Sequence, residues 1–232
     1  MKTKTNLYLF LIALISAMGG FLFGYDWVVI GGAKPFYEQY FQIANCPTTQ
    51  GWAMSSALIG CLIGALSAGK LSDQLGRKPI LIVAAGLFIC TAIGTGATNS
   101  FGWFNVFRLI GGFAIGIASS LSPMYIAEIA PAHLRGRFVS INQLTVVLGI
   151  LSAQIVNWQI AEPVADHATA EMIRLSWNGQ TGWRWMFWAM TVPAALFFFF
   201  SFVLPESPRW LASSGYKEKA FRIFTKIGGE AH

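Results

Sequence analysis

The stretch GGFLFGYDWVVIGGA, residues 19–33, decides how this chain folds, because it places one acid, Asp26, inside a long apolar run. The run extends from Leu7 to Ala33 and contains no other charged residue. About 20 apolar residues, each rising about 1.5 Å along a helix, are enough to cross a hydrocarbon core about 30 Å thick. The run therefore predicts a transmembrane helix with a carboxylate inside it.

A carboxylate in a membrane span is costly, about 2.5–3.5 kcal/mol on insertion scales, so it normally faces a bundle interior or a wet cavity and has a partner. Arg108 is the matching charge. Asp26 lies seven residues before the end of the first apolar run, and Arg108 lies seven residues after Phe101, where a later run begins. Because these spans run in opposite directions, both charges lie at a depth of about 10 Å. We expect an Asp26–Arg108 ion pair, which is either a proton or cation relay or a static link between helices.

The composition is that of a chain that crosses a membrane several times. It is 55% hydrophobic and 11% charged, against about 25% charged in soluble domains. Apolar segments occur at 7–33, 51–69, 79–99, 102–126, 138–160 and 183–204. We predict an all-α bundle of six transmembrane helices over 1–204, followed by a cytoplasmic amphipathic helical segment over 205–232.

Two glycine patterns indicate how the helices pack. GGFLFG at 19–24 is echoed by GGFAIG at 111–116, which favours a 3+3 inverted repeat of the spans, although chance similarity between glycine-rich helices is the alternative. Small residues at four-residue spacing let helices approach closely in lipid. The pairs are Gly20 and Gly24, Gly60 and Gly64, and Gly112 and Gly116.

The basic residues are sorted by side of the membrane. The loops at 70–78, 127–137 and 205–232 and the amino terminus together hold 12 of the 16 Lys and Arg residues. By the positive-inside bias these loops and both termini are cytoplasmic, in the cell (inner or plasma) membrane. Because the basic residues are sorted by side of the membrane and do not gather in one patch, a nucleic-acid partner is not expected despite the net charge of +6.

No pattern predicts an enzyme. A nucleophile with a base, a metal-ligand cluster and a phosphate-binding loop are all missing from the sequence, so we expect no bound cofactor or metal. The fifth span carries a stripe in which Gln143, Gln154 and Asn157 share one helix face with Ile150. Buried amides need partners, which are either other helices or a polyhydroxylated ligand.

Several stretches together resemble one family. They are GFLFGYD at 20–26, GKLSDQLGRK at 69–78, RLIGGFAIGIASSLSPMYIAEIAP at 108–131, NQ at 142–143, GWRWMF at 182–187 and PESPRWL at 205–211. They are similar to the amino-terminal six-helix half of the sugar porters of the major facilitator superfamily. Within that family the proton-coupled xylose symporters and the glucose transporters are the most similar. In the second stretch, glycine allows a tight turn, and Asp73 either caps the next helix or pairs with Arg77.

The resemblance implies proton-coupled symport of a monosaccharide, a hexose or a pentose, by alternating access. It implies that Asp26 is the proton-coupling acid with Arg108 as its partner, and that Phe23, Gln143 and Ile150 line the sugar site. It also implies a charged network that holds the cytoplasmic side closed. That gate network consists of Asp73, Arg77, Glu128, Arg135, Arg137, Glu206 and Arg209.

The family's members have twelve spans, and the second half supplies most sugar ligands. This chain resembles one half, so its expected partners are a monosaccharide, the lipid bilayer, and either a second six-span half or a homodimer partner. Three other functions stay open at this point: a non-transporting sugar sensor, a structural membrane subunit, and an inactive fragment of a twelve-span porter.

Overall fold

The computed structural model describes residues 2–165 and 167–228, so Met1 and the last four residues of the segment predicted over 205–232 lie outside the described residues. Every regular element in this part of the chain is helical. Six of the helical segments are long and apolar enough to cross a membrane. The predicted all-α bundle of six spans is therefore confirmed.

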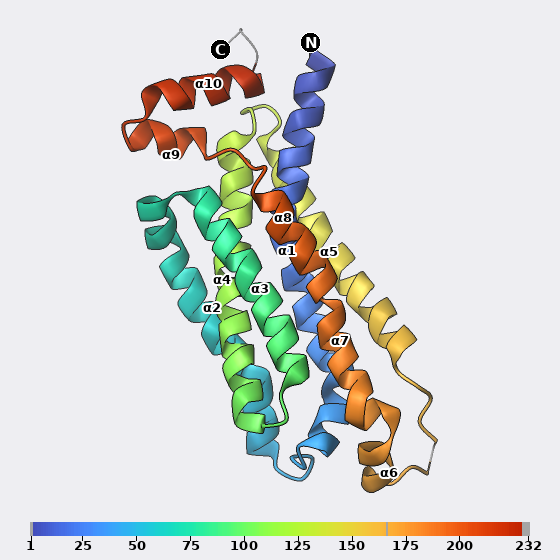
Figure 1. Cartoon of the computed structure of the whole chain (residues 1–232). Helices are drawn as coiled ribbons and strands as arrows, with labels where there is room; N and C mark the ends of the chain where they lie inside the picture. Colours follow the sequence, from blue (N-terminus) through green and yellow to red (C-terminus); the bar gives the residue numbers. More distant parts are fainter. Residues whose placement is uncertain (1, 166, 229–232) are drawn as a thin grey trace.

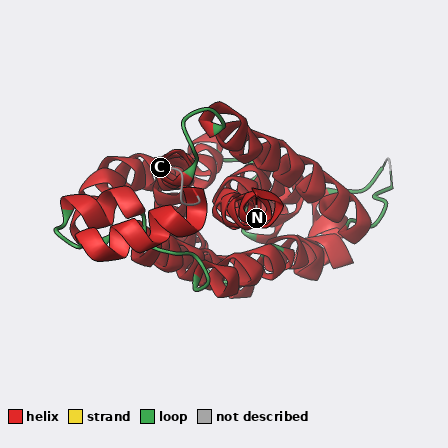
Figure 2. Cartoon of the chain, turned by 90° about the horizontal axis from the view of Figure 1, so that it is seen from above, coloured by secondary structure: helices red, strands yellow, loops and turns green. Residues whose placement is uncertain are grey.

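The helices form a bundle with the start of α1 and helix α10 at the same end (Figure 1). In chain order they are α1 (Lys2–Tyr40), α2 (Pro47–Leu75), α3 (Arg77–Ala97), α4 (Phe101–Ile129), α5 (Arg135–Ile160), α6 (Ala170–Leu175), the π-helical turn η1 (Asn178–Gly182), α7 (Trp183–Ala189), α8 (Thr191–Ser201), α9 (Pro208–Ser213) and α10 (Lys217–Gly228). Seen along the helices, the bundle is elongated and the start of α1 lies near its middle (Figure 2).

Two span boundaries differ from the prediction. Helix α1 does not end at Ala33 but continues through Pro35 to Tyr40. The sixth span begins earlier than predicted, at Asn178, and is divided at Met190 into α7 and α8. Pro193 follows this division, and because proline has no N–H it cannot donate a helical hydrogen bond to the carbonyl four residues earlier.

The inverted repeat is visible in the packing of α1 on α5 and of α2 on α4. Six glycines among the described residues lie so close to a backbone carbonyl of the facing helix that a methyl group has no room; Gly60 and Gly112 belong to the α2–α4 interface alone, and the other four form matching contacts. Between α1 and α5, Gly24 packs on Val146 and Gly149 on Phe21; between α4 and α2, Gly116 packs on Cys61 and Gly64 on Phe113. Aligning GGFLFG with GGFAIG pairs Gly24 with Gly116 and Phe21 with Phe113. The two interfaces therefore repeat the same contacts, and the predicted 3+3 architecture is confirmed together with the packing role of these glycines.

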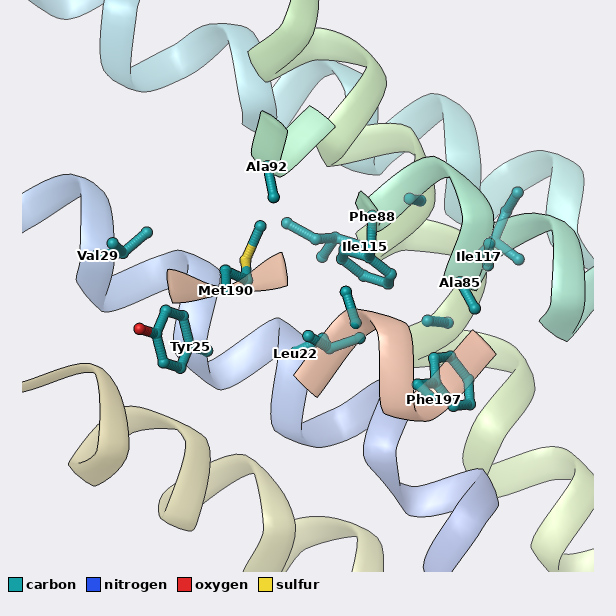
Figure 3. Close-up of a cluster of buried hydrophobic side chains, with 14 of the residues drawn as sticks. Leu22, Tyr25, Val29, Ala85, Phe88, Ala92, Ile115, Ile117, Met190 and Phe197 are labelled. Atoms are coloured by element: carbon teal, nitrogen blue, oxygen red, sulfur yellow. The ribbon is translucent and has the colours of Figure 1, made fainter. Parts of the chain in front are cut away.

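The buried core lies between α1, α3, α4 and α8. Leu22, Phe88, Ile115 and Phe197 meet there from these four helices (Figure 3). Tyr25 lies at the edge of this cluster, with its hydroxyl pointing away from it. Because α1 and α4 both contribute to the core, charges that they carry near it are removed from water.

Candidate functional site

The central feature of the site is a buried ion pair between α1 and α4. Nη1 of Arg108 donates to Oδ1 of Asp26 at 2.7 Å, and the two side chains are 4% and 5% exposed. The ring of Phe187, from α7, covers the guanidinium, with its centroid 5.9 Å from Cζ. The pair that equal depth in the membrane predicted is therefore present.

The surroundings of this pair leave it few other partners. Nε of Arg108 and the hydroxyl of Tyr25 are buried and have no hydrogen-bond partner among the described residues. In a low-dielectric site, removing one member of an ion pair leaves the other charge uncompensated, which costs about 3–5 kcal/mol. A change in the charge of either member therefore changes the stability of the other in this site.

A groove with both apolar and polar lining lies between α1, α4 and α5, and its α4 residues, Ser119 and Pro123, lie about three turns or more along the helix from Arg108. Its volume is about 350 Å³, and Phe23 and Gln143 both line it. Its other polar lining residues are Ser119, Ser140 and Asn142. Hydroxyl and carboxamide groups beside one aromatic ring suit a polyhydroxylated ligand, and ligand sites of about 300–1,000 Å³ are common. The structure thus brings together two of the three predicted sugar-site residues.

The third predicted residue, Ile150, lies farther along α5, where its backbone approaches Gly24, and it does not line this groove. The polar stripe of α5 is also divided. Asn157 is buried and its Nδ2 lies 3.5 Å from the carbonyl oxygen of Val28 on α1. Gln154 is exposed. Helix packing therefore explains Asn157, whereas Gln143 and Gln154 are free to face a ligand or a partner.

The predicted gate network is partly assembled at the end of the bundle that carries α9 and α10. Arg77 donates to both oxygens of Glu128, from Nε at 3.1 Å and from Nη2 at 3.0 Å, and its Nη1 lies 2.9 Å from Oδ1 of Asp73. Oε1 of Glu206 accepts from the backbone N–H of Arg77 at 2.9 Å and of Lys78 at 3.2 Å. Glu206 thereby caps the first turn of α3. Of the two roles expected for Asp73, the structure has the ion pair with Arg77.

The other three predicted members are not part of this cluster. Arg135, Arg137 and Arg209 are exposed, and none of them forms an ion pair within the described part of the chain. The turn between α2 and α3 is the single residue Gly76, whose φ of 98° suits glycine. A side chain there would collide with Glu206.

Two residues of this region were missed by sequence reasoning. Ser207 donates from Oγ to Glu128 and caps α9 by accepting from the N–H of Trp210. The hydroxyl of Tyr125 donates to the carbonyl of Pro205 at 2.6 Å. The available signal was the position of Ser207 before Pro208, because serine followed by proline is typical of a helix start.

Sequence reasoning also predicted no structural role for Arg184, although it belongs to the stretch GWRWMF at 182–187. It is 8% exposed and holds the end of α3. Its Nη1 donates to the carbonyls of Gly96 and Thr98, both at 2.7 Å, and its Nη2 donates to Oδ1 of Asn99 at 2.8 Å. The guanidinium also stacks on Trp183, with 4.5 Å between Cζ and the ring centroid. Among the described residues, no three His, Cys, Asp or Glu side chains gather as metal ligands.

Comparison with known proteins places this arrangement in context. Residues 12–232 match the family described as "Sugar (and other) transporter". A glucose transport protein of Synechocystis sp. is 41% identical over 98% of this chain and 47% of its own length. A D-xylose-proton symporter of Escherichia coli strain K12 is 39% identical over 99% of this chain and 50% of its own length.

The fold also matches solved structures. The structure of the proton:xylose symporter XylE bound to 6-bromo-6-deoxy-D-glucose matches with a TM-score of 0.87 and 37% identity, over 97% of this chain and 50% of that protein. This chain spans about half the length of the relatives that it matches.

Proposed function

This chain belongs to the family of sugar (and other) transporters, and from that premise we propose that it is one six-span half of a proton-coupled monosaccharide transporter. It is a multi-pass membrane protein related to transporters rather than to enzymes. The relatives named above are a D-xylose-proton symporter and a glucose transport protein. The activities of these relatives make a hexose or a pentose the proposed substrate and a proton the proposed coupling ion.

The observation that carries this proposal is the buried pair of Asp26 and Arg108. A proton taken up by Asp26 neutralises the carboxylate and frees the guanidinium, so the charge state of the site changes the contact between α1 and α4. A membrane carboxylate with a single strong partner suits a proton relay. A link that only held the two helices together could be made by two apolar side chains, without the cost of burying two charges.

The sugar is proposed to bind in the groove that Phe23 and Gln143 line, with a facing half completing the site. In alternating access two bundles rock around a central site. The facing half is either a second six-span segment or a second copy of this chain. The exposed apolar faces of α2 and α5, which include Leu66 and Trp158, are available for such contacts or for lipid.

The cluster of Arg77, Glu128 and Glu206 is proposed to act as the latch of the cytoplasmic side. The proposal also places both termini in the cytoplasm. It divides the chain into a membrane bundle over 1–204 and a cytoplasmic segment over 205–232. Helices α9 and α10 lie at the same end of the bundle as the start of α1 (Figure 1), which supports placing both termini on one side of the membrane. The cell membrane is the proposed location.

The test is sugar uptake into proteoliposomes. Two proteins are reconstituted: this 232-residue chain, and a fusion of it to the second half of the E. coli D-xylose-proton symporter. Labelled xylose and glucose are offered with and without an inward proton gradient. We expect accumulation driven by the gradient in at least one of the two proteins, and Asp26→Asn to abolish accumulation while sugar exchange without a gradient continues.

The control is Glu218→Gln, which removes an exposed carboxylate from α10 and is expected to leave accumulation unchanged. Uptake by the chain alone supports a homodimer, whereas uptake by the fusion alone supports a half that needs a different partner. If both proteins are folded and neither binds nor moves sugar, the proposal is wrong.

A further inference from the structure

Asn105 is a buried asparagine of α4 whose carbonyl oxygen is unused. It is 8% exposed, its Nδ2 donates to the carbonyl of Phe101 at 2.8 Å, and its Oδ1 has no hydrogen-bond partner among the described residues. Because a backbone carbonyl accepts only from the amide N–H, this bond fixes Oδ1 as the free atom. A buried acceptor without a donor costs about 1–3 kcal/mol, so its presence needs an explanation.

Arg108 lies one turn farther along the same helix, and it has a buried donor that lacks an acceptor, whereas Asn105 has a buried acceptor that lacks a donor. Its Nη1 donates to Asp26, but its buried Nε has no acceptor in the described part of the chain. Long side chains on a helix lean back over the turn that precedes their own Cα. The Arg108 side chain therefore extends along the face of α4 that carries Asn105. A free acceptor and a free donor thus lie one turn apart, beside the ion pair.

We propose that Asn105 is a positioning residue that receives the Arg108 guanidinium when Asp26 is protonated. In this step a proton from solution forms an O–H bond on the Asp26 carboxylate, and Arg108 keeps its own charge. Arg108 gives up the hydrogen bond from its Nη1 to Oδ1 of Asp26, and an N–H of the released guanidinium, Nε or Nη1, donates to Oδ1 of Asn105. The inference rests on the proposed role of Asp26 and deepens it, because it names what stabilises the protonated state.

Other groups of the neighbouring helices also face this region. Tyr37 of α1 interacts electrostatically with Arg108 and with Glu38, which pairs with Lys34, and Cys61 of α2 interacts with Asp26. The Tyr25 hydroxyl of α1 is buried without a hydrogen-bond partner among the described residues, but it belongs to the helix of Asp26 and not to that of Arg108. From α7, Arg184 directs its N–H groups away, toward the end of α3. Beyond their first turns, α3, α5 and α8 carry no charged side chain among the described residues. Asn105 is therefore the free acceptor that α4 itself places beside its own arginine.

The experiment follows protonation of Asp26 directly. Infrared spectra of the purified chain in lipid are recorded over a pH series, and the carboxylic acid C=O band that Asp26→Asn removes is assigned to Asp26. Without the acceptor the protonated state is less stable, so Asn105→Leu is expected to move the midpoint of this band about one pH unit lower, the equivalent of one charge-assisted hydrogen bond. Asn105→Gln retains the acceptor and the midpoint. Asn105→Asp offers Arg108 a second carboxylate and raises the midpoint.

Asn157→Leu is the matched control, because Asn157 is also a buried asparagine with an unused Oδ1, but it belongs to α5 rather than to the helix of Arg108, and its Nδ2 faces the carbonyl of Val28. It is expected to leave the midpoint of the band in place. The inference is overturned if Asn105→Leu has the wild-type midpoint, if Asn157→Leu shifts it as far, or if Asp26→Asn removes no band. Should Asn105→Leu not fold, a midpoint for Asn105→Asp that is no higher than that for Asn105→Gln overturns it instead.

The spectroscopic readout separates this inference from the proposed function. A shifted band in a chain that moves no sugar supports the role of Asn105 and counts against transport. Proton-driven uptake with an unshifted band supports transport and rejects the role of Asn105.

Discussion

Replacing Gly116 by alanine tests whether the repeated glycine contacts hold the bundle together. A Cβ at this position collides with the backbone carbonyl of Cys61 on α2, and backbone cannot move aside as a flexible side chain can. Overpacking typically costs about 1–3 kcal/mol, and we expect the upper end here, about 3 kcal/mol. The greater helix propensity of alanine offsets about 1 kcal/mol of this. The net expectation for Gly116→Ala is a loss of about 2 kcal/mol of stability.

Gly31→Ala is the matched control, because Gly31 is also inside a spanning helix but has no atom within 4 Å of its ideal Cβ. The same propensity gain without a collision predicts about 1 kcal/mol of stabilisation. Thermal unfolding of both variants in detergent, followed by tryptophan fluorescence, should therefore separate them by about 3 kcal/mol. The repeat adds a second requirement, that Gly24→Ala on α1 destabilises about as much as Gly116→Ala. Equal stability of the Gly116 and Gly31 variants would refute the packing argument.

Three further predictions concern other parts of the chain. A hydrogen bond from the Thr49 side chain lowers the pKa of the exposed Cys46 thiol. Because the thiolate forms above the pKa, labelling by a membrane-impermeant maleimide should accelerate at a lower pH than in Thr49→Val, and it should occur only from the outer side. Arg184→Leu leaves the buried carbonyl of Gly96 and the partly buried carbonyl of Thr98 without this donor, which costs about 1–3 kcal/mol for the buried one and should lower the thermal unfolding midpoint. Arg77→Lys replaces the two-bond contact with Glu128 by one bond and should destabilise the chain by about 1–3 kcal/mol. A double-mutant cycle with Glu128→Gln should then show a coupling energy between the two positions.

The number of spans and the ion pair were predictable because the membrane imposes strict rules. A buried charge requires a partner at its own depth, and this requirement was enough to join Asp26 to Arg108 across the sequence. The boundary errors have local causes. Helix α1 passes Ala33 because polar residues are tolerated in a helix beyond the hydrocarbon core, and the sixth span divides before Pro193 because of the missing N–H.

The gate network was less predictable, because motif positions do not determine which side chains meet. Arg77 and Arg135 both belong to charged loops, yet Arg77 is anchored on two oxygens of Glu128 while Arg135 is exposed. The role of Glu206 as the cap of α3 depends on a chain reversal after the sixth span, which brings residues more than 100 positions apart into contact. No local pattern contains that information.

The repeat explains why the charged residues stand out from the packing around them. When Gly24 is aligned with Gly116, Asp26 corresponds to Ala118, and Arg108 corresponds to Ser16. Ser16 and Ala118 are completely buried small residues, so each repeat carries one charge at a position where the other repeat has only a small side chain. The glycine contacts that the two interfaces share involve no charged side chain. The Asp26–Arg108 pair has no counterpart in the repeat, and the shared helix packing does not require it. This is the strongest structural reason to look for function at Asp26 and Arg108.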